Sequence, residues 1–167
     1  MMNQKGQSLV EALIALGVAS MVVSAMAVAA ITAVNNSDFS KYQSLAANYA
    51  QQGMEIVRQK SQTDWNYFYN TYVGHPPPNV GLWCLDGGSS VLVSRPAVGC
   101  GQNISQNGKA FFKRDVELAE TSSGNLSCHG TVLATITVSW TDGKCSGGGF
   151  CHDVTIESCF TDINAGS

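Results

Sequence analysis

The sequence predicts an α+β fold in which a long N-terminal helix packs on a small antiparallel β-sheet with disulfide-pinned loops. The chain is apolar from Leu9 to Val34 and then amphipathic to about Lys60, which indicates one helix. Apolar and polar residues alternate in Thr131–Trp140 and again in His152–Phe160, which indicates strands. All six cysteines lie in the C-terminal half, and their even number favours disulfides.

Composition points to a membrane-anchored chain. The length of 167 residues suffices for one domain and an extension, and the formal net charge of −3 is unlike that of a nucleic-acid-binding protein. The segment Leu9–Val34 contains a single charged residue, Glu11, whereas the remainder is polar and rich in Gly, Ser, Thr and Asn. We therefore expect a membrane segment and a soluble part of roughly 100–130 residues.

The apolar segment is long enough to cross a bilayer. A helix from Leu9 to Val34 would be about 39 Å long, against a hydrocarbon core of about 30 Å. A carboxylate at its centre would cost roughly 2.5–3.5 kcal/mol, and less near the interface, so Glu11 should have a partner. A secretory signal cut within Ala25–Ala30 and a plain uncleaved anchor are the alternatives, but a signal peptide has a shorter apolar core.

The start of the chain carries a recognisable pattern. A leader with one basic residue, Lys5, ends in Gly6, an apolar helix follows at once, and Glu11 lies shortly beyond. This pattern resembles the class III signal of type IV pilins and type II secretion pseudopilins. The resemblance implies that a prepilin peptidase cuts between Gly6 and Gln7 on the cytoplasmic side and N-methylates Gln7. Most members have phenylalanine or methionine at that first mature position, so Gln7 departs from the family's pattern.

The resemblance also gives Glu11 a role, the neutralisation of a terminal amine during filament assembly. Cleavage would leave a positive amine at the membrane end of one helix, and an unpaired charge there is costly. The expected partner of Glu11 is therefore the amine of another copy or of a related pilin. Small residues four apart would allow close helix packing, although they are also ordinary in membrane helices. These residues are Ser20 and Ser24, and Ala25, Ala29 and Ala33.

Beyond Val34 the helix should continue with one face on the soluble domain. Apolar or small residues recur there at three- and four-residue steps. They are Phe39, Tyr42, Ala46, Tyr49, Gly53, Ile56 and Val57. The stretch LAANYAQQGMEIVRQ (Leu45–Gln59) resembles the helix end of minor pilins and minor pseudopilins. We expect a leader at 1–6, a transmembrane and assembly helix at 7–34, its amphipathic continuation at 35–63, and a globular head at 64–167.

The head should begin with a connector, Asp64–Asn79, because its prolines disfavour further helix. Its aromatic residues are Trp65, Tyr67, Phe68, Tyr69 and Tyr72. We expect them to pack over the sheet edge; the alternative is a stacking surface for a receptor, a sugar or single-stranded DNA.

Four strands are predicted, and the last two should form a hairpin. They are Val91–Val93, Phe111–Ala119, Thr131–Trp140 and His152–Phe160. If the hairpin turn centres near Gly148, Trp140 opposes Ile156 and Ile136 opposes Phe160. The apolar faces of both strands then point the same way, toward the helix.

Six cysteines allow 15 disulfide connectivities, and spacing alone does not choose among them. The predicted hairpin favours Cys145–Cys151 across its turn and Cys128–Cys159 at one end of the sheet, which leaves Cys84–Cys100. Pilins often pin the C-terminal region with a disulfide, so three would make this chain an elaborated member.

The sequence gives little sign of catalysis. It has no nucleophile motif, phosphate loop or paired carboxylates, so we expect no enzyme activity, cofactor or metal. Zinc at Cys128-His129 and Cys151-His152 would need the cysteines that disulfides use. Calcium at Asp142, Asp153, Glu157 and Asp162 would lack an ordered ligand loop. Lys109, Lys113 and Arg114 form a small basic cluster that could contact DNA, although a solvated strand face is the favoured interpretation.

These observations predict a minor pilin: a structural subunit of a type IV pilus-like filament that supports adhesion, motility or DNA uptake. The alternatives are a type II secretion minor pseudopilin and an anchored or secreted disulfide-rich binding domain that does not polymerise. The expected partners are the prepilin peptidase, other pilins, the assembly platform, and the membrane at residues 9–34; DNA or a host surface has no support in the sequence. We expect a single pass through the inner membrane with the C-terminal domain outside the cytoplasm, and then the filament.

Overall fold

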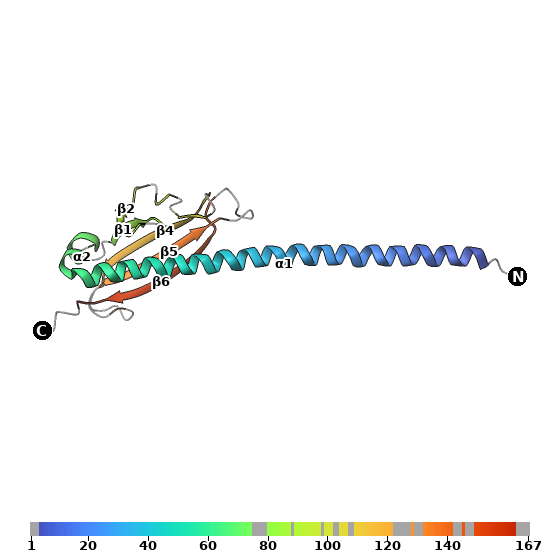
Figure 1. Ribbon diagram of the computed structural model, residues 1–167, viewed down its shortest axis with the longest axis horizontal. Helices are drawn as coiled ribbons and strands as arrows, with labels where there is room; N and C mark the ends of the chain where they lie inside the picture. Colours follow the sequence, from blue (N-terminus) through green and yellow to red (C-terminus); the bar gives the residue numbers. More distant parts are fainter. Residues whose placement is uncertain are drawn as a thin grey trace. The chain divides into compact units, whose positions relative to one another are not determined.

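The computed structural model describes residues 4–74, 80–87, 89–97, 99–101, 104–106, 109–121, 128, 132–141, 145 and 149–162 (Figure 1). The side chains of residues 4–8, 105–106 and 109–111 lie outside this description. The chain forms two compact units, Met1–Lys41 and Tyr42–Ser167.

The first helix, α1 (Gln4–Thr63), has 60 residues and contributes to both units. No proline interrupts this sequence, which is rich in alanine and other residues that favour a helix. The predicted helix from about Leu9 to about Lys60 is confirmed and is longer at both ends. In particular, the end of the proposed leader is already helical.

A second helix, α2 (Trp65–Tyr72), occupies the first half of the predicted connector, so that part of the prediction was wrong. Its N-cap is Asp64, which has an extended backbone and accepts a hydrogen bond of 2.9 Å from the Tyr67 amide. An aspartate at this position stabilises a helix start. The residues after Gly74, including the three prolines, lie outside the described residues.

The described part of the chain contains one antiparallel sheet of six strands. Five of them lie side by side in the order β2-β1-β4-β5-β6. Strand β3 pairs with the beginning of β4. The strands are β1 (Val80–Leu85), β2 (Leu92–Ser94), β3 (Ile104–Gln106), β4 (Lys109–Glu120), β5 (Val132–Trp140) and β6 (His152–Phe160). All four predicted strands are present within a few residues of their expected bounds. Strands β1 and β3 were missed, because neither has a clear alternation of apolar and polar residues.

The β5–β6 hairpin exists, but its predicted register was wrong. Trp140 pairs with His152 rather than with Ile156, and Ile136 pairs with Ile156 rather than with Phe160. The connection between the paired ends of β5 and β6 is therefore shorter than we expected. Because the shift is an even number of residues, the same side chains still face α1.

The core of the second unit lies between α1 and one face of the sheet. Figure 1 shows this part of α1 running alongside β4, β5 and β6. On the helix, Ala46, Ala50, Met54 and Val57 are buried. The facing sheet residues are also buried: Phe112, Val116, Leu118, Val132, Ala134, Ile136, Val138 and Trp140. Tyr49 packs edge-on against Phe112, with ring centroids 5.2 Å apart.

The predicted apolar face of the helix is confirmed in the second unit, with differences at its edges. Ala50 and Met54 belong to the core but were not predicted, whereas Phe39, in the first unit, is 38% exposed. At Gly53, α1 lies close to the sheet. A Cβ atom built there would lie 3.1 Å from Arg114 Cδ and 3.2 Å from Ile136 Cδ1.

Three disulfides hold the loops of the second unit: Cys84–Cys100, Cys128–Cys159 and Cys145–Cys151. Two of these are the pairs that the predicted hairpin favoured, and Cys84–Cys100 is the pair that it left. They enclose sequence separations of 16, 31 and 6 residues, respectively. Cross-links of this kind typically stabilise a domain by about 2–4 kcal/mol each, chiefly by restricting the unfolded chain.

Candidate assembly segment on the N-terminal helix

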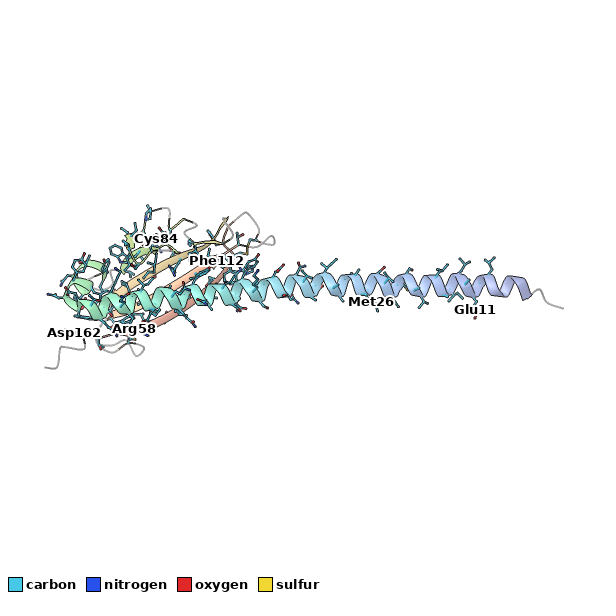
Figure 2. The ribbon with its side chains drawn as sticks, viewed as in Figure 1. Glu11, Met26, Arg58, Cys84, Phe112 and Asp162 are labelled. Carbon is cyan, nitrogen blue, oxygen red and sulfur yellow. A yellow bond between two sulfur atoms is a disulfide. The ribbon has the colours of Figure 1, made fainter. Side chains whose placement is uncertain are left out.

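The first unit presents apolar side chains on all sides of α1. Between Leu9 and Val34 the large apolar side chains are between 47% and 75% exposed, with Val22 and Met21 at the two limits. Figure 2 shows Met26 projecting from the helix in this segment. Water does not stabilise a helix that is apolar all round, so a membrane or other protein chains must cover this surface.

The hydroxyl groups of this segment are satisfied within the helix itself. Ser20 Oγ donates to the Gly17 carbonyl at 2.8 Å, and Ser24 Oγ donates to the Ser20 carbonyl at 2.8 Å. Thr32 Oγ1 donates to the Val28 carbonyl at 2.9 Å. These side chains can therefore enter an apolar environment without leaving an unpaired donor.

Glu11 is different. Its side chain is exposed on α1 (Figure 2), and none of the side chains that the structure describes forms an ion pair with it. A carboxylate that leaves water without a partner incurs a large desolvation cost. Once its helix is covered, Glu11 therefore needs a positive group other than the side chains described here.

The proposed processing bond lies close to Glu11 on the same helix. The backbone is helical from Gln4 onward, so Gly6 and Gln7 both belong to the start of α1. Gln7 and Glu11 are four residues apart, which places both on one face of the helix, about 6 Å apart along its axis. A new amine at Gln7 would thus lie about one helical turn before Glu11, on the same face of α1.

By length and composition, α1 could cross a membrane. The segment Leu9–Thr63 contains a window with a mean hydropathy of 2.3, none of which is buried within the protein. Its apolar part coincides with the membrane segment expected from the sequence.

The basic cluster considered in the head is divided, because Lys113 and Arg114 lie on opposite faces of β4. Arg114 is buried, at 1% exposure, on the face toward α1. Lys113 lies on the opposite face, where its Nζ contacts Asp115 Oδ2 at 2.9 Å. The side chain of Lys109 lies outside the described residues.

Arg114, on β4, instead donates to backbone carbonyls of α1 and of the end of β1. Its Nε donates to the Leu85 carbonyl at 3.0 Å, its Nη1 to the Tyr49 carbonyl at 2.8 Å, and its Nη2 to the Asp86 carbonyl at 2.9 Å. Burial lowers the pKa of Arg114 to about 10, and the nearby Asp86 carboxylate opposes this shift. The guanidinium remains charged at neutral pH. Nothing in the local sequence distinguishes it from a surface arginine, so sequence reasoning missed this role.

The residues considered for metal binding have other roles or lie apart. Cys145, Cys151 and His152 bring potential ligand atoms within 4.8 Å of one another, but the two sulfur atoms form a disulfide. Asp153 and Glu157 are exposed on β6, and Asp162 follows that strand. His75, His129 and Asp142 lie outside the described residues.

The aromatic residues expected in the connector divide into two groups. Phe68 is buried and packs in the core, as the packing interpretation predicted. Tyr67 contacts the Tyr72 ring but is 60% exposed, so burial in the core does not account for it.

Comparison with known proteins identifies the N-terminal segment. Residues 1–27 match the family described as the prokaryotic N-terminal methylation motif, which indicates the class III signal of type IV pilins and pseudopilins. No curated protein and no solved structure matches the chain. The motif supports a pilin-like or pseudopilin protein with a structural role, and it implies processing by a prepilin peptidase and assembly with other pilins. Together with the apolar helix, it indicates membrane anchoring.

Proposed function

We propose that this protein is a minor pilin, a structural subunit of a type IV pilus-like filament. In this proposal residues 1–6 are a leader that a prepilin peptidase removes after Gly6, and Gln7 is the methylated first residue. Residues 7–34 anchor the precursor in the inner membrane and later enter the filament. Residues 35–63 continue the helix, and residues 64–167 form a head outside the cytoplasm that supports adhesion, motility or DNA uptake.

One observation carries the proposal: a lone carboxylate on an exposed apolar helix, within a matched methylation motif. A helix that stayed in the membrane as a plain anchor would gain nothing from Glu11 and would lose free energy by burying it. A helix that packs against other processed helices gains a countercharge from a neighbour's amine. The cost of burying Glu11 is then offset by pairing within a medium of low dielectric constant.

The substitution Glu11→Ala tests this role. We expect the variant to insert into the membrane normally but to be strongly depleted from sheared filaments, because the neighbouring amine loses its partner. Immunoblots of membrane and sheared-surface fractions measure both quantities. Glu55→Ala is a matched control, because Glu55 is an exposed glutamate on the same helix whose described ion pair is with Arg58. Normal incorporation of the Glu11→Ala protein would contradict amine–carboxylate pairing.

A type II secretion minor pseudopilin is the alternative that shares the same signal and helix. Such a subunit would act in a short filament within the envelope, so it would remain with the cells when surface filaments are sheared off. Loss of secretion, rather than loss of surface filaments, in a deletion strain would favour this alternative.

A further inference from the structure

The second unit has a cavity of about 330 Å³ that filament assembly does not explain. It lies between the last turns of α1, the helix α2 and Ser90, which precedes β2. This volume is at the small end of the range for ligand sites, so it suits one small ring or two rather than a large cofactor.

Two tyrosine rings line the cavity and meet nearly at right angles. The Tyr67 and Tyr72 centroids are 5.9 Å apart, with an interplanar angle of 82°. Tyr72 is held in place by an edge-on contact with Trp83 at 5.1 Å, and Trp83 Nε1 donates to the Tyr72 carbonyl at 2.7 Å. Tyr67 is 60% exposed despite its size. One ring is therefore fixed, and the other is an open apolar surface beside it.

The polar groups of the lining are varied and carry little net charge. Lys60 Nζ lies 5.5 Å from the centre of the Tyr72 ring, within the range of a cation–π contact. Asp64 supplies one carboxylate, which balances the charge of Lys60. Gln59 and Ser90 add an amide and a hydroxyl to the same lining. These groups can donate to and accept from a ligand that carries several hydroxyls.

We infer that this cavity binds one neutral pyranose ring of a carbohydrate. The C–H groups on one face of a pyranose are weakly positive and pack on the negative face of an aromatic ring, as Tyr67 offers. The hydroxyls around the ring pair with Lys60, Asp64 and Gln59. Since this site belongs to the second unit alone, the inference does not rest on filament assembly.

The same observations argue against single-stranded DNA at this site. Binding of a single strand uses a positive groove and rings on which successive bases stack. Here the charges of Lys60 and Asp64 cancel, and the two tyrosine rings are nearly perpendicular.

Saturation-transfer NMR on the full chain tests the inference. The protein is held in polyoxyethylene detergent, which carries neither a sugar nor a quaternary ammonium group. The probes are the methyl glycosides of glucose, galactose, mannose and N-acetylglucosamine at millimolar concentration. We expect at least one to receive saturation at its ring protons. Tyr67→Ala should weaken that binding about tenfold or more, because it removes the exposed ring.

Two variants make the result specific. Tyr67→Phe keeps the ring and should keep most of the binding. Thr155→Ala removes an exposed hydroxyl from β6, outside the cavity lining, and should change nothing. The inference is overturned if none of the four glycosides binds, or if binding survives in Tyr67→Ala. Binding of an oligonucleotide or a proline-rich peptide in place of all four sugars would also overturn it.

Discussion

Arg114 shows how far the role of a single residue can depart from its sequence context. A guanidinium with five donors in a fixed plane can satisfy several carbonyls at once, which an ammonium cannot do as well. In this protein it joins α1 to the end of β1 by donating to the Tyr49, Leu85 and Asp86 carbonyls. The charge is buried, but these carbonyls satisfy its donors.

Arg114→Leu should therefore destabilise the second unit strongly. Removal of a charged donor from buried carbonyl partners should lower the free energy of unfolding by about 3–5 kcal/mol. Arg114→Lys should retain part of the effect and cost about 1–3 kcal/mol, because one ammonium cannot reach all three acceptors. Urea unfolding followed by near-UV circular dichroism measures both changes.

Arg58→Ala serves as the control for charge. Its side chain is 47% exposed and pairs with the exposed Glu55, so its loss should change stability by less than about 1 kcal/mol. Equal stability of the Arg114→Leu and Arg58→Ala proteins would show that the three carbonyl contacts contribute nothing.

Tyr69 provides a second test at the residue scale, through pH. A hydrogen bond to Glu120, followed by burial, raises the pKa of Tyr69 above its ordinary value of 10.0. A raised pKa means that the folded protein holds the proton more tightly than the unfolded chain. The stabilisation is thus fully present below pH 10 and is lost as pH rises through the folded pKa.

Glu120→Gln should move the Tyr69 titration back toward its ordinary value, because the charged acceptor is gone. The Tyr69 titration is obtained by subtracting the tyrosinate absorbance titration of a Tyr69→Phe protein from that of the parent. The same subtraction in the Glu120→Gln background gives the pKa shift. An unchanged Tyr69 titration in the Glu120→Gln protein would mean that α2 is not held to β4 by this contact.

At the scale of elements, the packing of α1 on the sheet depends on Gly53. A side chain at this position would press on Arg114, which its three hydrogen bonds hold in place, and on Ile136. We expect Gly53→Val to lower the free energy of unfolding of the second unit by about 1–3 kcal/mol through overpacking. Thermal unfolding of the head, read by near-UV circular dichroism, measures this loss.

Gly17→Val is the matched control, because a Cβ built there would meet nothing within 4 Å beyond its chain neighbours and the adjacent helix backbone. It is the same substitution in the same helix, but in the first unit. Unfolding of the head should be unaffected. An equal loss in both variants would point to helix propensity rather than to helix–sheet packing.

The elements also explain which parts of the fold could be predicted from sequence. The long helix and the β5–β6 hairpin have strong periodic patterns, and both were found. Strand β1 (VGLWCL) has no alternation because it contains adjacent apolar residues, and β3 has only three residues. The hairpin register failed because it depends on turn length, which a glycine-rich loop does not specify.

The residues of the candidate site could be predicted where they lie close together in the sequence. Gly6, Gln7 and Glu11 lie within one short stretch, so their spacing could be recognised without a structure. Arg114 and the tyrosine-lined cavity depend on segments far apart in the chain. Arg114 donates to a carbonyl at a sequence separation of 65 residues, and no local pattern encodes such a contact.

At the scale of the whole molecule, two functions are expected along one chain. The first unit carries an apolar helical segment, Leu9–Val34, with one carboxylate, and this segment needs other helices or a membrane around it. The second unit contains a buried core, three disulfides and a lined cavity of its own. We expect changes at Glu11 to affect assembly without changing the stability of the head, and changes at Arg114 or Gly53 to do the reverse.

The central claim is that the chain is processed after Gly6 so that Glu11 can pair with a new amine. Intact-mass and N-terminal peptide mass spectrometry of the protein from membrane and sheared-surface fractions tests it most directly. We expect a mature chain that begins at Gln7, with or without a methyl group on its amine. A chain that keeps Met1, or one that begins near Val28–Ile31, would contradict prepilin processing and leave an anchored or secreted domain.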